Sequence, residues 1–130
     1  MEVGIGFERK RYENGETVFE IYMINHFGAE KIPPRPAVTM AIEQISKEQM
    51  KYTEAFIRNL ANSKPSDRDT IKTRYLTQMG RMIVKRCKDI IDSGEQLQHN
   101  APRTVAEKGF DQPLYETGLM QDSLAYEVKL

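Results

Sequence analysis

The side chains that most often perform covalent chemistry are few in this chain: two histidines, His26 and His99, and one cysteine, Cys87. A nucleophilic triad needs a histidine base within reach of a serine or cysteine, and neither histidine stands in a recognisable catalytic motif. We therefore interpret His26 as a structural residue near a helix end and His99 as a residue of a polar loop.

The sequence also contains no recognisable motif for binding a metal ion or a cofactor. Transition-metal sites draw on spacings such as CxxC, HxxxH or HExxH, and none of these occurs. Gly4-Ile5-Gly6 lacks the third glycine of a dinucleotide-binding loop, so we interpret it as part of a strand against which another backbone packs closely. Glu107 and Asp111 form a carboxylate pair, but no apolar pocket is indicated that would make one an acid and the other a base. We expect no catalytic residue, no cofactor and no metal ion.

The most unusual charge feature is the segment 64–88, which holds eight basic residues and only two acidic ones. Drawn as a helix with about 100° per residue, it places four basic residues on one stripe opposite the apolar face: Arg74, Arg81, Lys85 and Lys88. This stripe attracts phosphate, is a solvated face, or forms salt bridges to acids of a neighbouring subunit, and these interpretations stay open. Two further basic residues project into the apolar sector, which favours an assembly interface: Lys72 and Arg86.

Length, charge and hydropathy limit the class of protein. The 130 residues (15.0 kDa) are expected to form one domain, residues 1–130. Nineteen Lys and Arg balance nineteen Asp and Glu, so no overall field selects nucleic acid or an anionic membrane. One cysteine excludes an internal disulfide, no apolar stretch is long enough to span a membrane, and no apolar signal region follows Met1. These features predict a soluble protein made in a reducing cytoplasm.

Hydrophobic alternation predicts a strand at each end of the chain, over residues 2–8 and 124–130, and the two strands are suited to pair. Asn14-Gly15 predicts a turn. A capping box of Thr17 and Glu20 favours a helix that stops at Gly28, although residues 18–24 also fit a strand.

The middle of the chain predicts two long helices. Residues 32–36 contain three prolines and form a stiff extended connector. Apolar residues at intervals of three and four then predict one helix from Pro36 to about Asn62 and a second from Ser66 to just before Gly94, arranged as an antiparallel hairpin. Such helices exceed what a small sheet needs for cover, so part of their length is expected to pack against other subunits.

The predicted fold class follows from this order of elements. It is α+β, with a small antiparallel sheet joining the N- and C-terminal strands, packed with two long helices and one short helix. Residues 95–116 lack periodicity and form a long loop, of the kind that is functional or becomes ordered against a partner.

Four short segments carry a family resemblance. They are Tyr12-Glu13-Asn14-Gly15, Ile24-Asn25-His26-Phe27-Gly28, Ile32-Pro33-Pro34-Arg35-Pro36, and Pro113-Leu114-Tyr115-Glu116-Thr117-Gly118, the last followed by Met120, Ser123 and Leu124. In this order the chain resembles the head-tail joining and tail-completion proteins of tailed-phage necks. These minor virion proteins have an Asn-x-Phe-Gly-like element, a proline-rich IPPRP and a PLxxTG close to the terminal strand. The resemblance spans nearly the whole chain.

The resemblance implies a structural subunit without catalytic activity. It implies a homohexameric ring in the virion neck, made in the host cytoplasm, between the head-tail connector or adaptor protein and the tail terminator or tail tube protein. Genomic DNA would touch the ring transiently in the channel, with the basic stripe facing the channel or rim, and no membrane is involved. The expected contacts with subunits and partners come from the two proline segments: Ile32, Pro33, Pro34, Arg35, Pro36, Pro113, Leu114, Thr117 and Gly118.

Alternatives from other classes remain. The basic stripe also fits a small nucleic-acid-binding module, whereas an enzyme would need a pocket that none of the spacings indicates. Residues 32–36 also fit a plain connector that starts a helix, and residues 113–118 a plain turn before the last strand.

Overall fold

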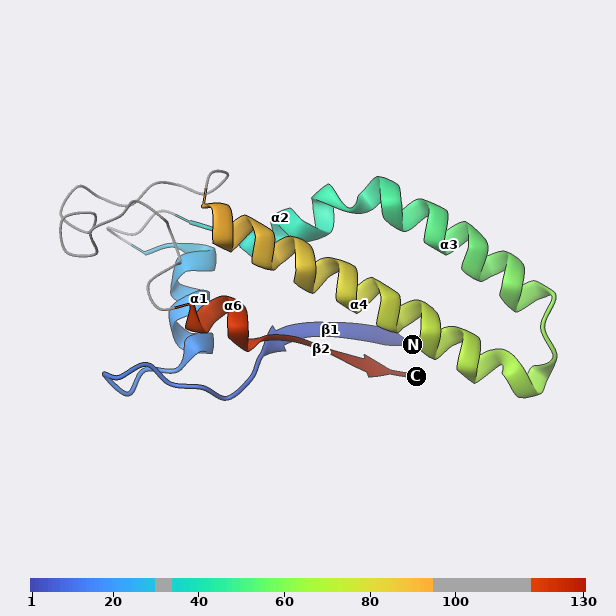
Figure 1. Ribbon diagram of the computed structural model, residues 1–130, viewed down its shortest axis with the longest axis horizontal. Coiled ribbons are helices and arrows are strands. Elements are labelled where there is room, and N and C mark those ends of the chain that lie inside the picture. The colour runs from blue at the N-terminus through green and yellow to red at the C-terminus, as the bar shows by residue number, and fades with distance from the viewer. Residues whose placement is uncertain (30–33, 95–117) are drawn as a thin grey trace.

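The sheet joins the two ends of the chain, as predicted. The computed structural model describes residues 1–29, 34–94 and 118–130 (Figure 1). Strand β1 (Glu2–Phe7) pairs antiparallel with β2 (Leu124–Lys129). The register places Ile5 opposite Tyr126. Because side chains alternate along a strand, the apolar residues of both strands share one face.

Helix α1 (Val18–Phe27) confirms the helical interpretation of its segment. The side-chain oxygen of Thr17 accepts from the Glu20 amide, and the Glu20 carboxylate accepts from the Thr17 amide, which satisfies two otherwise unpaired helix donors. Gly28 ends the helix at φ 78° and ψ 173°, a positive φ that lies outside the left-handed helical region.

The expected single helix from Pro36 to Asn62 is wrong: the structure contains two helices, α2 (Ala37–Gln44) and α3 (Ser46–Ala61). They meet at Ile45 and run in different directions (Figure 1). Hydrogen bonding continues through the bend, since the Ile45 amide donates to Ala41 and the Ile45 carbonyl accepts from Gln49. The reason for the bend is burial: Ile45 is 1% exposed in the main core, whereas α3 follows α4 away from that core.

Helix α4 (Arg68–Ser93) is the longest element, about 39 Å at 1.5 Å per residue. A short 3₁₀ turn, η1 (Pro65–Asp67), precedes it, so the N-cap is Asp67, one residue after the expected N-cap Ser66. Gly94 ends it in the left-handed conformation, with φ 67°. Helices α3 and α4 form the predicted antiparallel hairpin, whose joined end projects beyond the strands (Figure 1).

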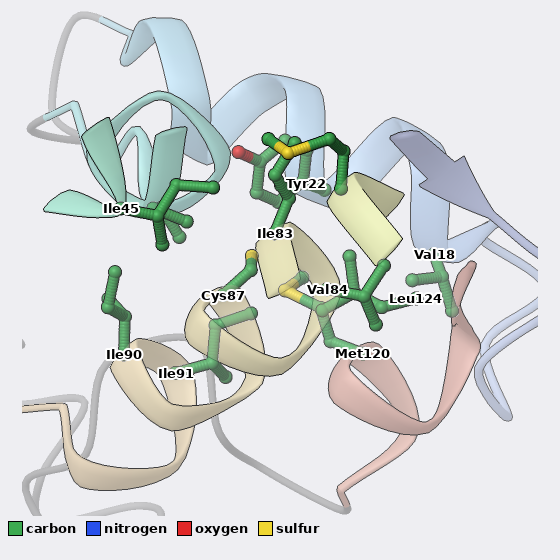
Figure 2. Packing of buried hydrophobic residues seen from close by; sticks show 13 residues of the cluster. Val18, Tyr22, Ile45, Ile83, Val84, Cys87, Ile90, Ile91, Met120 and Leu124 are labelled. Atoms are coloured by element: carbon green, nitrogen blue, oxygen red, sulfur yellow. The ribbon is translucent and has the colours of Figure 1, made fainter. Parts of the chain in front are cut away.

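The main core surrounds the C-terminal half of α4. The sheet contacts α4, as does α2, and α1 and the short helix α6 (Leu119–Ser123) close the end away from the hairpin loop (Figure 1). Buried apolar side chains from these elements converge there (Figure 2): Val18, Tyr22, Ile45, Ile83, Cys87, Ile90, Ile91, Met120 and Leu124. The α+β class is therefore as expected, with the first long helix divided at Ile45 and α6 added.

Helix α4 packs closely on the sheet at a glycine of the helix, and not at the strand glycines that the sequence suggested. A Cβ added to Gly80 in α4 would lie 2.6 Å from the Tyr126 ring, so this helix position accepts only glycine at the observed distance. At Gly4 and Gly6 an added Cβ would meet nothing within 4 Å. The expected close packing against these two strand glycines is therefore wrong within this chain, because they lie on the face of the sheet opposite to α4.

Candidate functional site

The proline connector is fixed to the end of α1 through Arg35. The side chain of Arg35 is only 7% exposed, and its Nη1 donates to Asn25 Oδ1 at 2.9 Å. The Arg35 amide also donates to the Asn25 carbonyl, and Asn25 Nδ2 donates to the Ile21 carbonyl at 2.9 Å. Two of the segments that carry the family resemblance therefore form one hydrogen-bonded unit. Arg35 serves this internal contact, while Pro34 is exposed and Pro36 half-buried.

A buried tyrosine connects α1 to the start of α2. The Val38 amide donates to Tyr22 Oη at 3.0 Å, and Tyr22 Oη lies 2.8 Å from His26 Nδ1. Since the oxygen accepts from Val38, its own hydrogen is free to go to His26. Burial raises the pKa of Tyr22 to about 12, which keeps the hydroxyl protonated. His26 therefore has the structural place near a helix end that the sequence indicated.

The second proline segment is described only at its end. Gly118 is buried and adopts φ 79°, a conformation that favours glycine, immediately before α6. Within α6, Ser123 Oγ donates to the Leu119 carbonyl at 2.6 Å. Several predicted contact residues, and the expected loop 95–116, lie outside the described residues: Ile32, Pro33, Pro113, Leu114 and Thr117.

The basic stripe lies along one side of α4, as its spacing predicted. Arg74, Arg81 and Lys85 are exposed, and Lys88 is half-buried. Among the described residues, no carboxylate lies within 4 Å of any of these four cations. Arg86 differs, because its Nη2 lies 3.6 Å from Glu48 Oε1 across the hairpin, so that it meets an acid of its own chain.

The α3–α4 hairpin carries a hollow of about 260 Å³ beside its interhelical seam. Its lining is mostly apolar and includes Tyr52, Phe56, Ile71, Arg74 and Tyr75. The rings of Phe56 and Tyr75 stack with their centroids 4.2 Å apart, and Tyr75 Oη hydrogen-bonds Thr53 Oγ1 at 2.9 Å. These contacts hold the floor of the hollow in place. We call this surface the hairpin groove.

Helix α1 also exposes apolar side chains, on the side away from its buried residues. Phe19 is 56% exposed, Ile24 44% and Phe27 71%, and Met23 between them is half-buried because it also packs against the main core. The spacing of Phe19, Met23 and Phe27 by four residues places them on one stripe. We call these four residues the α1 face. The α1 face was not predicted. For the long helices the sequence predicted packing against other subunits without locating the hairpin groove, because apolar periodicity alone does not show which residues the core covers.

The described residues bear on metal and thiol chemistry in two ways. They contain no group of three or more His, Cys, Asp and Glu placed to hold a metal ion. Cys87 is fully buried, and burial raises the pKa of its thiol to about 12, which removes the thiolate that a nucleophile needs. None of the helices in the described ranges has the length and apolar character needed to cross a membrane.

No family model matches this chain, and no curated protein and no solved structure matches it either. Several surfaces of the chain itself bear on its function. Those surfaces are the hairpin groove, the α1 face, the basic stripe and the connector held by Arg35.

Proposed function

We propose that this chain is a structural protein of a tailed-phage neck. Copies of it form a ring that completes the upper end of the tail and docks to the head-tail connector. The family resemblance implies that this ring is a hexamer. On the tail side the ring meets the terminator or tail tube protein. Its work is binding, and the free energy of assembly comes from apolar burial between subunits, with charge setting register and partner choice.

The observation that carries an assembly role is the exposed apolar surface at both ends of the molecule. The α3–α4 hairpin extends beyond the sheet, and few other described residues cover it (Figure 1). Large side chains stay exposed on it, among them Met50 (64%) and Ile57 (59%). Exposed apolar residues gathered on projecting elements are typical of interfaces with other proteins.

The choice of a phage neck among assemblies rests on the family resemblance. The hydrogen bond between Arg35 and Asn25 supports this choice, because it joins two of the segments that carry the family resemblance. This contact holds the residues just before α2 against α1, and both helices contribute to the core.

Electron microscopy of phage particles made without this protein tests the proposal. We expect filled heads and separate tails, with joining restored when the wild-type chain is supplied. The same preparations can be labelled with antibody to the chain, and we expect label at the neck of complete virions. Tails that join heads normally in its absence contradict the proposal.

A second candidate is a nucleic-acid-binding module. It is favoured by the four cations of the basic stripe, which have no ion-pair partner among the described residues and extend over about 21 Å of helix. In the ring, the part of this stripe that neighbouring copies leave exposed would line the DNA channel. Because DNA must leave through that channel, tight phosphate binding would oppose the neck function, and exposed charges are screened by salt.

A further inference from the structure

The hairpin groove has the form of a receptor for a helix. Two antiparallel helices bury one side of each against the other and leave a seam on which a third helix can pack. The floor of this seam is fixed by the stacked pair of Phe56 and Tyr75, while Tyr52 at its side is still 44% exposed. Arg74 is the one charged residue in the described lining.

The α1 face has the form of the matching ligand. Its apolar residues recur at intervals that bring them to one side of the helix, as in peptides that bind a groove as a helix. Glu20 is the one acidic residue of α1 and is exposed. It lies four residues before Ile24 and seven before Phe27, so it stands beside the apolar residues of that face. The ligand therefore carries one negative charge and the receptor one positive charge.

The two surfaces cannot meet within one molecule. Helix α1 lies at the end opposite to the hairpin loop (Figure 1). A second copy has both surfaces, so a head-to-tail contact covers one end of each molecule, and closure of a ring covers every end. Each contact can be weak by itself, because ring closure makes the last contact intramolecular.

We propose that the α1 face of one copy docks in the hairpin groove of the next, with Glu20 beside Arg74 of its neighbour. The occupant of the groove is thus a second copy of this chain. This inference deepens the proposed ring and rests on it for its biological setting, but its physical content is a self-association that can be measured on the isolated full chain.

The first experiment compares single variants by sedimentation equilibrium. Tyr52→Ser in the groove and Phe27→Gln on the α1 face are each expected to raise the dissociation constant of self-association at least about tenfold, as loss of a central aromatic contact does. Ile42→Ser is the matched control, because Ile42 in α2 is 44% exposed, as is Tyr52, but belongs neither to the groove nor to the α1 face. It is expected to associate like the wild type.

A mixing experiment tests the head-to-tail geometry. Tyr52→Ser retains an intact α1 face, and Phe27→Gln retains an intact groove. An equimolar mixture is therefore expected to form dimers but no larger assemblies, although each variant alone stays monomeric. Circular dichroism and urea unfolding of each variant establish that it is folded.

A double-mutant cycle tests the charge pair. Glu20→Gln keeps the capping function, because glutamine also serves in a capping box, and removes the charge. Combined with Arg74→Gln, it is expected to weaken association less than the sum of the two single changes. Additive effects would place the two residues in separate contacts and contradict the proposed pair.

Other outcomes would reject either the docking proposal or the neck proposal. A wild-type chain that stays monomeric at its highest soluble concentration, or a mixture that stays monomeric, overturns the docking proposal. A different result would reject the neck proposal alone. In that case the variants would associate as expected, yet heads and tails would join in the absence of the protein. Conversely, joining that depends on the protein but survives Tyr52→Ser and Phe27→Gln would keep the neck function and reject these surfaces.

Discussion

Arg35 Nη1 donates a hydrogen bond of 2.9 Å to Asn25 Oδ1, and the Arg35 amide donates to the Asn25 carbonyl. Side chain and backbone of one residue thus hold the proline connector against the C-terminal turn of α1. The guanidinium is almost fully buried, so its desolvation must be offset by hydrogen bonds of this kind. The IPPRP segment is therefore more than a spacer, because its arginine is part of the fold.

A double-mutant cycle on this pair has a definite expected result. Asn25→Ala and Arg35→Ala are each expected to lower the free energy of unfolding by about 1–3 kcal/mol, since each removes the part-buried hydrogen bond between the two side chains. The double variant is expected to lose less than the sum, with a coupling of at least about 0.5 kcal/mol. Urea unfolding measures all four proteins. If the two losses of unfolding free energy were strictly additive, the hydrogen bond between the two side chains would make no contribution to stability.

Tyr22→Phe tests the connection between α1 and α2. The substitution removes the acceptor of the Val38 amide, which lies in the first turn of α2 and has no intrahelical partner. We expect a loss of about 1–3 kcal/mol in unfolding free energy. Tyr52→Phe is the control, because Tyr52 is exposed, and its unfolding in dilute protein should match the wild type. Equal stability of Tyr22→Phe and the wild type would contradict the prediction.

Alkaline pH is expected to destabilise the fold through Cys87 and Tyr22. Burial raises the pKa of the thiol from 9.0 to about 12 and that of the phenol from 10.0 to about 12. The folded protein therefore keeps protons that the unfolded chain releases, so stability is complete below pH 9 and falls between pH 9 and pH 12. Urea unfolding at a series of pH values should show this fall, and Cys87→Ala should flatten it first between pH 9 and 10. Parallel curves for the two proteins would refute the role of the thiol.

The contact between Gly80 and Tyr126 predicts an unusual response to alanine. In most helix interiors, replacing glycine with alanine stabilises by about 1 kcal/mol. Here the added methyl group meets the Tyr126 ring at 2.6 Å, so Gly80→Ala is expected to destabilise by about 1–3 kcal/mol. In a Tyr126→Ala background the same change should cost less, because the ring is absent. Urea unfolding of the four proteins checks this, and an equal cost in both backgrounds would show that the ring is not the obstacle.

The parts of the fold that were predictable are those fixed by local chemistry. Alternation in the terminal strands, the capping box at Thr17 and the glycine after α4 each act within a few residues. The bend at Ile45 was not predictable, because no proline or glycine marks it and its cause is burial against distant residues. The same holds for the interaction surfaces: apolar periodicity shows that a face exists, but only the fold shows whether the chain itself covers it.

The basic stripe gives the last prediction, which separates the neck from a nucleic-acid-binding module. If the stripe lines a channel that DNA passes, the isolated chain should bind duplex DNA weakly and lose that binding as salt rises, because each phosphate contact releases condensed counterions. Replacing Arg74, Arg81, Lys85 and Lys88 with glutamine should abolish this binding and leave urea unfolding unchanged, since these side chains form no ion pair among the described residues. Tight binding at physiological salt that depends on the four residues would instead favour the nucleic-acid-binding module, because such a site would hold DNA in the channel. Fluorescence anisotropy with a labelled duplex at several salt concentrations distinguishes the two outcomes.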